Sequence, residues 1–385
     1  MMKRQSLSPA THIDTEANLR HLAEFLSDAP LVAIDTESNS LYAYQERVCL
    51  IQLSTRAEDF IIDPLAIEDM SPLAPIFESP VIEKVFHAAE YDIICLKRDF
   101  GFRFNHLFDT MAAARICGIK AIGLSNLLLE YAGIALDKSH QRDDWGKRPL
   151  SPDSLKYAQM DTHYLPLLRD ELHQIISAQN HWQEAQEVFI ELCNTPASTA
   201  RDIDPDGFWN IGRPYSLSRR EMSILRELYL LREDIAQSED KPPFKVLDNR
   251  TLVRLARKAP TSPRDLQHLK GIGNGRFTRS KKDILKAIKR GKTSECPSLP
   301  PPPEIPDPAV VERYAALQTW RKERAVQRGV ESDIIMSKHV LWDIAHKAPT
   351  TLDDLRLTSG LGAWRFNTYG EEILAVLEQC AVPES

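Results

Sequence analysis

The stretch LVAIDTES, residues 31–38, places two acids at the end of a short apolar run. Such a run is typical of a buried strand. Side chains two positions apart on a strand point to the same face, so Asp35 and Glu37 lie side by side while Thr36 turns away. Two neighbouring carboxylates can share one cation through their oxygens. The stretch therefore predicts a buried strand of a sheet that presents a pair of acids.

Two more acids occur in contexts that can bring them to the same place. Asp92 follows the short apolar segment EKVFHA and falls in the first turn of a helix predicted over residues 90–100. Asp161 lies four residues after Tyr157 in SPDSLKYAQMDTHYLPLL, where Ser151 or Ser154 can cap a helix. Residues four apart share a helix face, so a phenol and a carboxylate are presented together.

This ordered set of D-x-E on a strand, Asp on a helix and Y-x-x-x-D on a later helix resembles the three motifs of the DEDD exonucleases in their tyrosine subtype. Four other stretches are similar to the ribonuclease D family, and the resemblance covers residues from about 10 to 210. These stretches are CLIQLS at 49–54, FDTMAAARICG at 108–118, GLSNLL at 123–128 and LDKSHQRDDW at 136–145.

The resemblance implies a ribonuclease H-like α/β fold, a mixed five-stranded sheet with helices, in which the acids meet at one edge. Apolar periodicity agrees with it. Strands are expected near 31–37, 47–54, 58–63, 83–87 and 104–108, and helices near 15–27, 90–100, 109–117, 124–132 and 153–175.

The resemblance also implies a two-metal-ion phosphodiesterase with Mg²⁺ or Mn²⁺, the cations that oxygen ligands favour. One cation would be bound by Asp35, Glu37 and Asp161, and the second mainly by Asp35, with Asp92 reaching it through water. Tyr157 would orient or deprotonate the attacking water. Orientation is favoured because a phenol has an unperturbed pKa near 10.

Other polar residues near these motifs can be interpreted either as structural or as functional. His87 could contact substrate or simply be satisfied by local hydrogen bonds. Asp109 is better explained as the N-cap of the helix in FDTMAAA than as a catalytic group. The segment around Trp145 could contact RNA or be a solvated loop with a buried tryptophan. Its polar candidates are Lys138, Gln141 and Arg142.

The C-terminal half contains an internal repeat. Residues 252–277 align without gaps to residues 341–366 at a constant offset of 89. Helical spacing and Pro and Gly breaks predict two helical bundles, and their A-x-x-x-P and G-x-G features resemble the HRDC domain. Their GIG and GLG turns could offer backbone amides to phosphate or serve as packing turns.

The two copies differ in net charge. Residues 213–292 contain 21 Lys and Arg against 9 acids, whereas residues 309–380 contain 9 against 10. Residues 1–212 contain 18 against 32 acids, which explains the overall net charge of −7. The first copy is therefore the candidate for phosphate binding, through a basic run that includes Arg276, Arg279, Lys281 and Lys282.

The predicted organisation is an exonuclease domain at 1–211, a first HRDC domain at 212–292, a Pro-rich linker at 293–308 and a second HRDC domain at 309–380. Residues 292–308 contain seven prolines, which favours an extended spacer. No run of 18 apolar residues occurs and the start has no signal-peptide pattern, so we expect no membrane span. Scattered cysteines are typical of a cytoplasmic protein.

We therefore expect a 3′–5′ exoribonuclease that releases nucleoside 5′-monophosphates. The resemblance points to RNA as the partner, specifically tRNA precursors with 3′ trailers, and no obligate protein partner is evident. Two alternatives are a DNA 3′–5′ exonuclease, because proofreading domains share these acids, and a non-catalytic nucleic-acid-binding scaffold. The presence of all five expected active-site residues argues against the scaffold.

Overall fold

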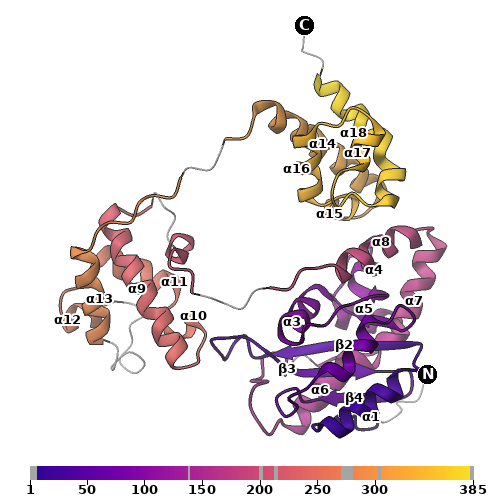
Figure 1. The fold of residues 1–385 in the computed structure, drawn as a ribbon, viewed down its shortest axis with the longest axis horizontal. Coiled ribbons are helices and arrows are strands. Elements are labelled where there is room, and N and C mark those ends of the chain that lie inside the picture. The colour runs from indigo at the N-terminus through magenta and orange to yellow at the C-terminus, as the bar shows by residue number, and fades with distance from the viewer. Residues whose placement is uncertain are drawn as a thin grey trace. The chain divides into compact units, whose positions relative to one another are not determined.

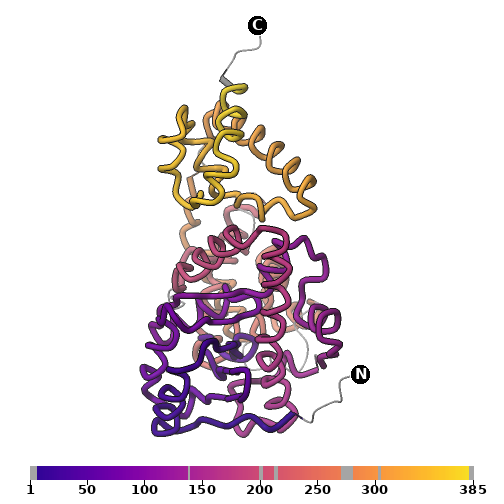
Figure 2. The backbone as a smooth tube through the Cα atoms, turned by 90° about the vertical axis from the view of Figure 1, so that its right-hand side faces the viewer, coloured from indigo at the N-terminus to yellow at the C-terminus, as the bar shows by residue number. Residues whose placement is uncertain are grey.

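The protein is described here by a computed structural model that covers residues 7–137, 139–198, 203–211, 216–269, 281–301 and 305–381 (Figures 1 and 2). Backbone contacts divide the chain into two compact units. The first contains Met1–Ser38, Val48–Ser198 and Ile305–Ser385, and the second contains Asn39–Arg47 and Thr199–Glu304. The first unit therefore includes both the α/β domain, residues 7–198 without 39–47, and the second helical bundle, residues 305–381.

A mixed sheet forms the centre of the α/β domain, in the order β1-β4-β3-β2-β5-β6. Strand β3 runs antiparallel to β2 and β4, and the other neighbours are parallel. The sheet has one strand more than the five predicted, because a three-residue segment too short to show a pattern pairs with β4. The strands are β1 (Thr11–Ile13), β2 (Leu31–Ser38), β3 (Val48–Ser54), β4 (Asp59–Ile62), β5 (Glu83–Phe86) and β6 (Leu107–Asp109).

The helix expected over 153–175 is divided in two at Tyr164. Pro166 lacks an amide hydrogen and fits only the first turn of a helix, so a new helix begins there. The short α2 and the longer α8 were not predicted. The helices of this domain are α1 (Glu16–Leu26), α2 (Ala74–Glu78), α3 (Glu90–Phe100), α4 (Thr110–Ile116), α5 (Leu124–Ala132), α6 (Pro152–His163), α7 (Leu165–Ala178) and α8 (Trp182–Cys193), with a 3₁₀ turn η1 (Ser71–Leu73).

Side-chain N-caps fix where two helices near the site begin. Ser151 caps α6, because its hydroxyl accepts from the Ser154 amide at 3.0 Å. Asp109 caps α4 as predicted, accepting from the amides of Met111 and Ala112 at 2.8 and 2.9 Å. Its other contacts, with the amides of residues 88 and 89, tie the start of α3 to the end of β6. Helix α6 then packs on β2, β3 and β4.

The first helical bundle lies in the second unit, and its core includes residues from elsewhere in the chain. Tyr44, from the connection between β2 and β3, and Phe208 are buried among its apolar side chains. The Tyr44 hydroxyl donates to Glu233 at 3.2 Å, and its amide donates to Asp240 at 3.0 Å. The elements are η2 (Gly207–Asn210), α9 (Arg219–Ser238), α10 (Pro243–Val246), α11 (Asn249–Lys258), α12 (Pro263–Gln267) and α13 (Lys281–Thr293).

The second bundle repeats the first at the offset of 89 residues. Helices α11 and α16 are both ten residues long and bury the same four positions. A buried arginine recurs too, since Arg232 donates to the Leu247 carbonyl and Arg321 to the Met336 carbonyl. The sequence repeat is thus also a structural repeat. The elements are α14 (Pro308–Arg328), α15 (Ser332–Ile335), α16 (Lys338–Lys347), α17 (Leu352–Arg356) and α18 (Ala363–Ala381).

Arginines of the second bundle bind acids of α8 within the first unit. The buried Arg365 contacts Glu187 and Glu191 at 3.1 and 2.7 Å, and Arg328 contacts Glu184 at 2.7 Å. The Glu187 carboxylate also accepts from the Trp364 amide at 2.7 Å, beside the GLG turn. An amide of the first turn of α18, directly after the GLG turn, therefore binds a carboxylate of the same chain. The GIG turn lies outside the described residues.

No helix in the described part of the chain is both long and apolar enough to cross a membrane.

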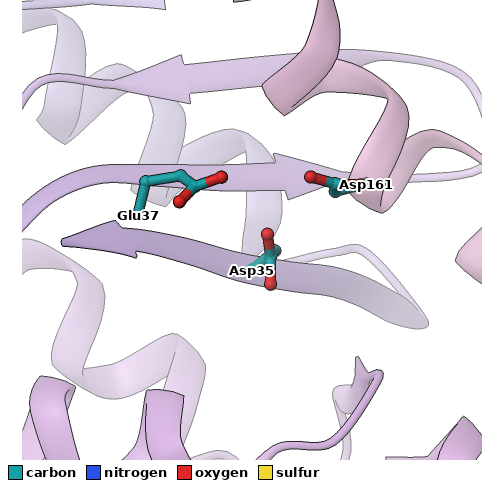
Figure 3. Close-up of side chains that lie close together, drawn as sticks. All are labelled: Asp35, Glu37 and Asp161. Atoms are coloured by element: carbon teal, nitrogen blue, oxygen red, sulfur yellow. The ribbon is translucent and has the colours of Figure 1, made fainter. Parts of the chain in front are cut away.

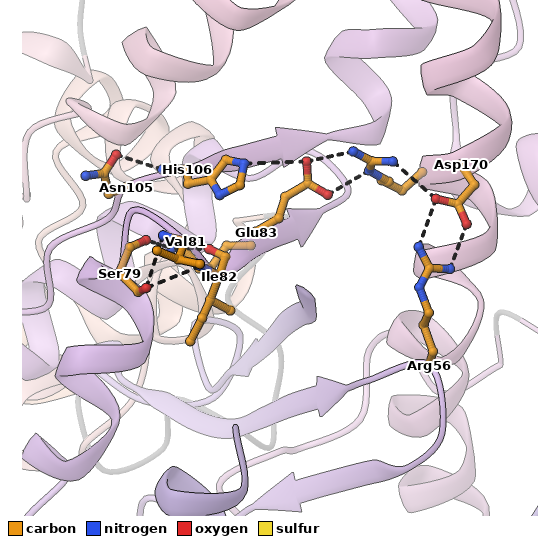
Figure 4. Close-up of polar contacts among 10 residues, drawn as sticks. Arg56, Ser79, Val81, Ile82, Glu83, Asn105, His106 and Asp170 are labelled. Atoms are coloured by element: carbon orange, nitrogen blue, oxygen red, sulfur yellow. Dashed lines mark hydrogen bonds and ion pairs between the residues drawn. The ribbon is translucent and has the colours of Figure 1, made fainter. Parts of the chain in front are cut away.

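A chain of ion pairs ties α7 to β5 and to the turn after β3 (Figure 4). Arg169 binds Glu83 through two nitrogens at 2.6 and 3.0 Å, and Arg56 binds Asp170 at 2.6 and 3.0 Å. The Glu83 side chain is only 9% exposed and Arg169 20%. Removing one partner would leave a charge with little access to water, whereas an exposed pair contributes little.

Arg169→Gln is therefore expected to lower the free energy of unfolding by about 2 to 3 kcal/mol, below the value for a fully buried pair because Arg169 is partly exposed. Arg20→Gln, which removes the exposed α1 pair with Glu16, is the control and should change it by less than about 1 kcal/mol. Urea titrations of both variants measure the difference. Equal losses in the two variants would contradict this assignment.

Candidate active site

Three of the predicted acids meet at the junction of β2 and α6. One carboxylate oxygen from each of Asp35, Glu37 and Asp161 lies within 4.8 Å of the other two (Figure 3). Strand alternation places the first two on one face of β2, as predicted, and the packing of α6 on β2 brings Asp161 to them. The two motifs farthest apart in the sequence therefore converge.

Asp92 lies close to this trio but not within it. It is buried in the first turn of α3, as predicted, and its carboxylate accepts a hydrogen bond from the Thr36 hydroxyl. Thr36 is the residue that turns away from Asp35 and Glu37. It is a functional candidate that the sequence analysis passed over, although strand alternation already pointed its side chain to the other face, where α3 follows the neighbouring β5.

Tyr157 projects from α6 one turn before Asp161 and is half-buried. Its ring packs near the indole of Trp145, with centroids 6.2 Å apart, and near the His140 imidazole at 6.3 Å. Trp145 is 1% exposed, so the buried-tryptophan reading of this residue is correct. A hollow of about 810 Å³ beside the acids is lined by Tyr157, Asp161 and the segment that precedes α6. Space for a ligand therefore adjoins the phenol.

The pKa values of the acids are raised because several of them lie close together with limited access to water. Desolvation raises the pKa of Asp161 to about 7 and, with repulsion from Asp35, Asp161 and Asp92, raises the pKa of Glu37 to about 10. Burial followed by repulsion from Asp161 raises the pKa of Asp35 well above its usual value. Burial likewise raises the pKa of the Tyr157 phenol. A nearby cation would reverse these shifts for the acids.

The donor set fits a hard divalent cation. Carboxylate oxygens are the ligands that Mg²⁺ and Mn²⁺ prefer, and among the described residues this trio is the one group of acids, histidines or cysteines close enough to hold an ion. The raised pKa values also indicate a cation site, because such a cluster of carboxylates is unfavourable until positive charge compensates it.

A polar network positions the segment before α6. Asp143 accepts from Ser154 at 2.7 Å and lies 2.8 Å from the His140 ring. These hydrogen bonds lower the pKa of Asp143. Arg148 donates to both oxygens of Asp63 at 2.6 and 2.7 Å. The sequence carried no spacing signal for the pair of Arg148 with Asp63, because the two residues come from separate stretches.

Of the other residues predicted to contact RNA, His87 does not join the acid cluster. His87 lies 2.9 Å from the Thr110 hydroxyl through Nδ1, and burial lowers the pKa of its imidazole, as a locally satisfied histidine would show. Gln141 and Arg142 are exposed in the segment before α6, and Lys281 and Lys282 open α13 in the other unit. Lys138, Arg276 and Arg279 lie outside the described residues.

Two family models match the chain. The 3′–5′ exonuclease model matches residues 10–177, which include all four acids and Tyr157. The HRDC domain model matches twice, at residues 221–288 and 311–377, in agreement with the two bundles.

Relatives of two kinds are similar to this chain. The exosome complex component 10 homolog of Caenorhabditis elegans is 35% identical over 67% of this chain, which covers only 30% of that protein. Ribonuclease D of Gluconacetobacter diazotrophicus is 29% identical over 94% of this chain and 92% of its own length.

Among solved structures, Escherichia coli RNase D, described as an exoribonuclease involved in structured RNA processing, matches with a TM-score of 0.67. It is 25% identical, and the match covers 97% of this chain and 99% of that one. An exonuclease domain that holds the acid cluster is followed here by two HRDC bundles, as the sequence resemblance implied. Residues 10–177 thus form a DEDD 3′–5′ exonuclease domain that is followed by two HRDC domains, and the chain is similar to ribonuclease D over nearly its full length.

Proposed function

We propose that the protein is a 3′–5′ exoribonuclease that hydrolyses RNA from its 3′ end to nucleoside 5′-monophosphates. The observation that carries this proposal is the convergence of Asp35, Glu37 and Asp161 at the β2–α6 junction, in a 3′–5′ exonuclease domain. The nearly full-length match to ribonuclease D supports RNA as the polymer.

Asp35, Glu37 and Asp161 would hold one divalent cation, and Asp35 with Asp92 would hold a second. Bound cations make a water nucleophilic near neutral pH and neutralise charge on the departing 3′ oxygen. Tyr157, whose raised phenol pKa keeps it protonated, would orient the attacking water by hydrogen bonding. Mg²⁺ and Mn²⁺ are the cations that this set of oxygen ligands favours.

The substrate we propose is a tRNA precursor with a 3′ trailer, since E. coli RNase D is described as acting in structured RNA processing. Lys281 and Lys282 on the first bundle, together with Gln141 and Arg142 before α6, would contact RNA. A cytoplasmic location and independence from an obligate protein partner stay predictions.

The deciding experiment is hydrolysis of a labelled tRNA precursor with Mg²⁺, with Mn²⁺ and with EDTA. Asp35→Asn should lower kcat by roughly a thousandfold or more, because a cation ligand common to both sites is lost. Asp153→Asn, an exposed acid in the first turn of the same α6, is the control and should keep full activity. Binding without cleavage under every condition would favour a scaffold, and faster cleavage of matched DNA would favour a DNA exonuclease.

Tyr157→Phe should lower kcat by about a hundredfold, because the ring is kept and the hydroxyl that orients water is lost. KM and cation affinity should stay nearly unchanged. Tyr164→Phe, at the end of the same helix and lining the same hollow, is the matched control. A fully active Tyr157→Phe enzyme would remove the phenol from the mechanism.

The stability of the cation-free protein should fall as pH rises. Asp161 and Glu37 have folded-state pKa values of about 7 and 10, above their ordinary values of 3.8 and 4.5, so the folded state binds more protons and gains stability below neutrality. Melting temperature in EDTA should therefore decrease from pH 5.5 to pH 8, and Mg²⁺ should raise it at pH 8. Glu37→Gln should flatten this pH dependence, and an unchanged slope in that variant would refute the assignment.

A further inference from the structure

One face of α11 in the first bundle carries a row of cationic side chains. Arg250, Arg254, Arg257 and Lys258 recur at helical spacing, while Leu252 and Leu255 on the other face are buried in the bundle core. From Arg250 to Lys258 the row extends about 12 Å along the helix axis. That length can face more than one phosphate of a strand.

These side chains surround a hollow of about 470 Å³. Its lining includes Val253 and Ile211 as apolar floor, with Arg250, Arg254, Arg257 and Lys258 around it. No ion pair to an acid is found for Arg250, Arg257 or Lys258 among the described residues, and Arg257 donates to the Ser216 carbonyl at 3.2 Å. Their positive charge is therefore not compensated by acids of the described chain.

The basic run on α13 differs in this respect. Lys286 pairs with Asp283 at 3.0 Å, Arg290 pairs with Glu227 at 2.8 Å, and Lys292 donates to the Ala259 carbonyl. Part of the densest charge cluster in the sequence is thus engaged inside the bundle. Helix α11, which the sequence analysis did not single out, carries Arg250, Arg257 and Lys258 without an ion pair to an acid of the described residues.

The second bundle provides an internal comparison. At the offset of 89, Arg250, Arg254 and Arg257 correspond to His339, Asp343 and His346 of α16. Asp343 neutralises Lys347 at 2.8 Å, so the equivalent face carries little net charge. The two helices share length and buried positions. The fold of the bundle therefore does not require the arginines of α11.

We infer that the α11 face is an RNA-binding surface that contacts the phosphate backbone independently of sequence. Arginine suits this role because its planar fork binds phosphate through two hydrogen bonds. Val253 and Ile211 provide an apolar floor between the cations, against which a ribose can lie. This inference rests on the proposed function, which makes RNA the substrate, and adds a second contact surface on the first bundle beside Lys281 and Lys282 of α13.

The test compares two full-length double variants that each remove two positive charges. Arg250→Gln/Arg257→Gln alters the α11 face, and Lys322→Gln/Lys338→Gln removes two exposed lysines of the second bundle. Binding of a labelled tRNA precursor is measured in EDTA across a series of salt concentrations. Turnover of a four-nucleotide RNA with Mg²⁺ is measured in parallel, since it reports the active site alone.

The α11 variant should bind the precursor on the order of tenfold more weakly at 0.1 M salt, and the slope of log K against log salt should fall by about 1.4 to 1.8. The lysine variant should bind like the parent, and the short RNA should be cleaved equally by all three proteins.

An unchanged salt slope in the α11 variant, or an equal loss in the lysine variant, would overturn the inference. Circular dichroism checks that both variants fold. If the parent protein binds with this pattern but cleaves neither RNA with Mg²⁺, the proposed function fails while the α11 surface stands.

Discussion

Crowding of half-buried carboxylates is the constraint on which the site depends. Desolvation and mutual repulsion make the ionised trio at the β2–α6 junction unfavourable by itself, and only bound positive charge relieves it. The fold maintains this arrangement with rigid elements, because β2 lies in the middle of the sheet and α6 packs across three strands. Cation affinity and local instability thus have the same physical origin.

Much of the site could be predicted from the sequence, because strand and helix periodicities fix which side chains share a face. Asp35, Glu37 and Asp161 converge as expected, and Asp109 is the helix cap it was predicted to be. The hydrogen bond from Thr36 to Asp92 and the pair of Arg148 with Asp63 depend on long-range packing, which no local pattern encodes. The same holds for β1, an edge strand of three residues defined only by its partner.

The two helical bundles show how one fold can carry different surfaces. In the second, Arg365 and the amide beside the GLG turn bind acids of α8, so a feature that could receive phosphate receives carboxylates of the same chain. In the first, arginines replace the neutral and acidic residues of the corresponding helix. The two bundles therefore share one fold, while the surface of the second contacts α8 and that of the first carries a row of cationic side chains.

The burial of Tyr44 in the first bundle has a consequence for the modularity of this protein. The segment that follows the catalytic strand β2 supplies part of the core of a bundle encoded some 170 residues later, along with Phe208 from just before that bundle. A fragment cut at residues 212–292 would lose both aromatic side chains, and a cavity would remain in the core where they had packed. Removing a buried aromatic side chain typically lowers the free energy of unfolding by about 3 to 5 kcal/mol. The bundle is thus a poor candidate for excision or for grafting onto another enzyme unless Phe208 and a substitute for the Tyr44 segment travel with it.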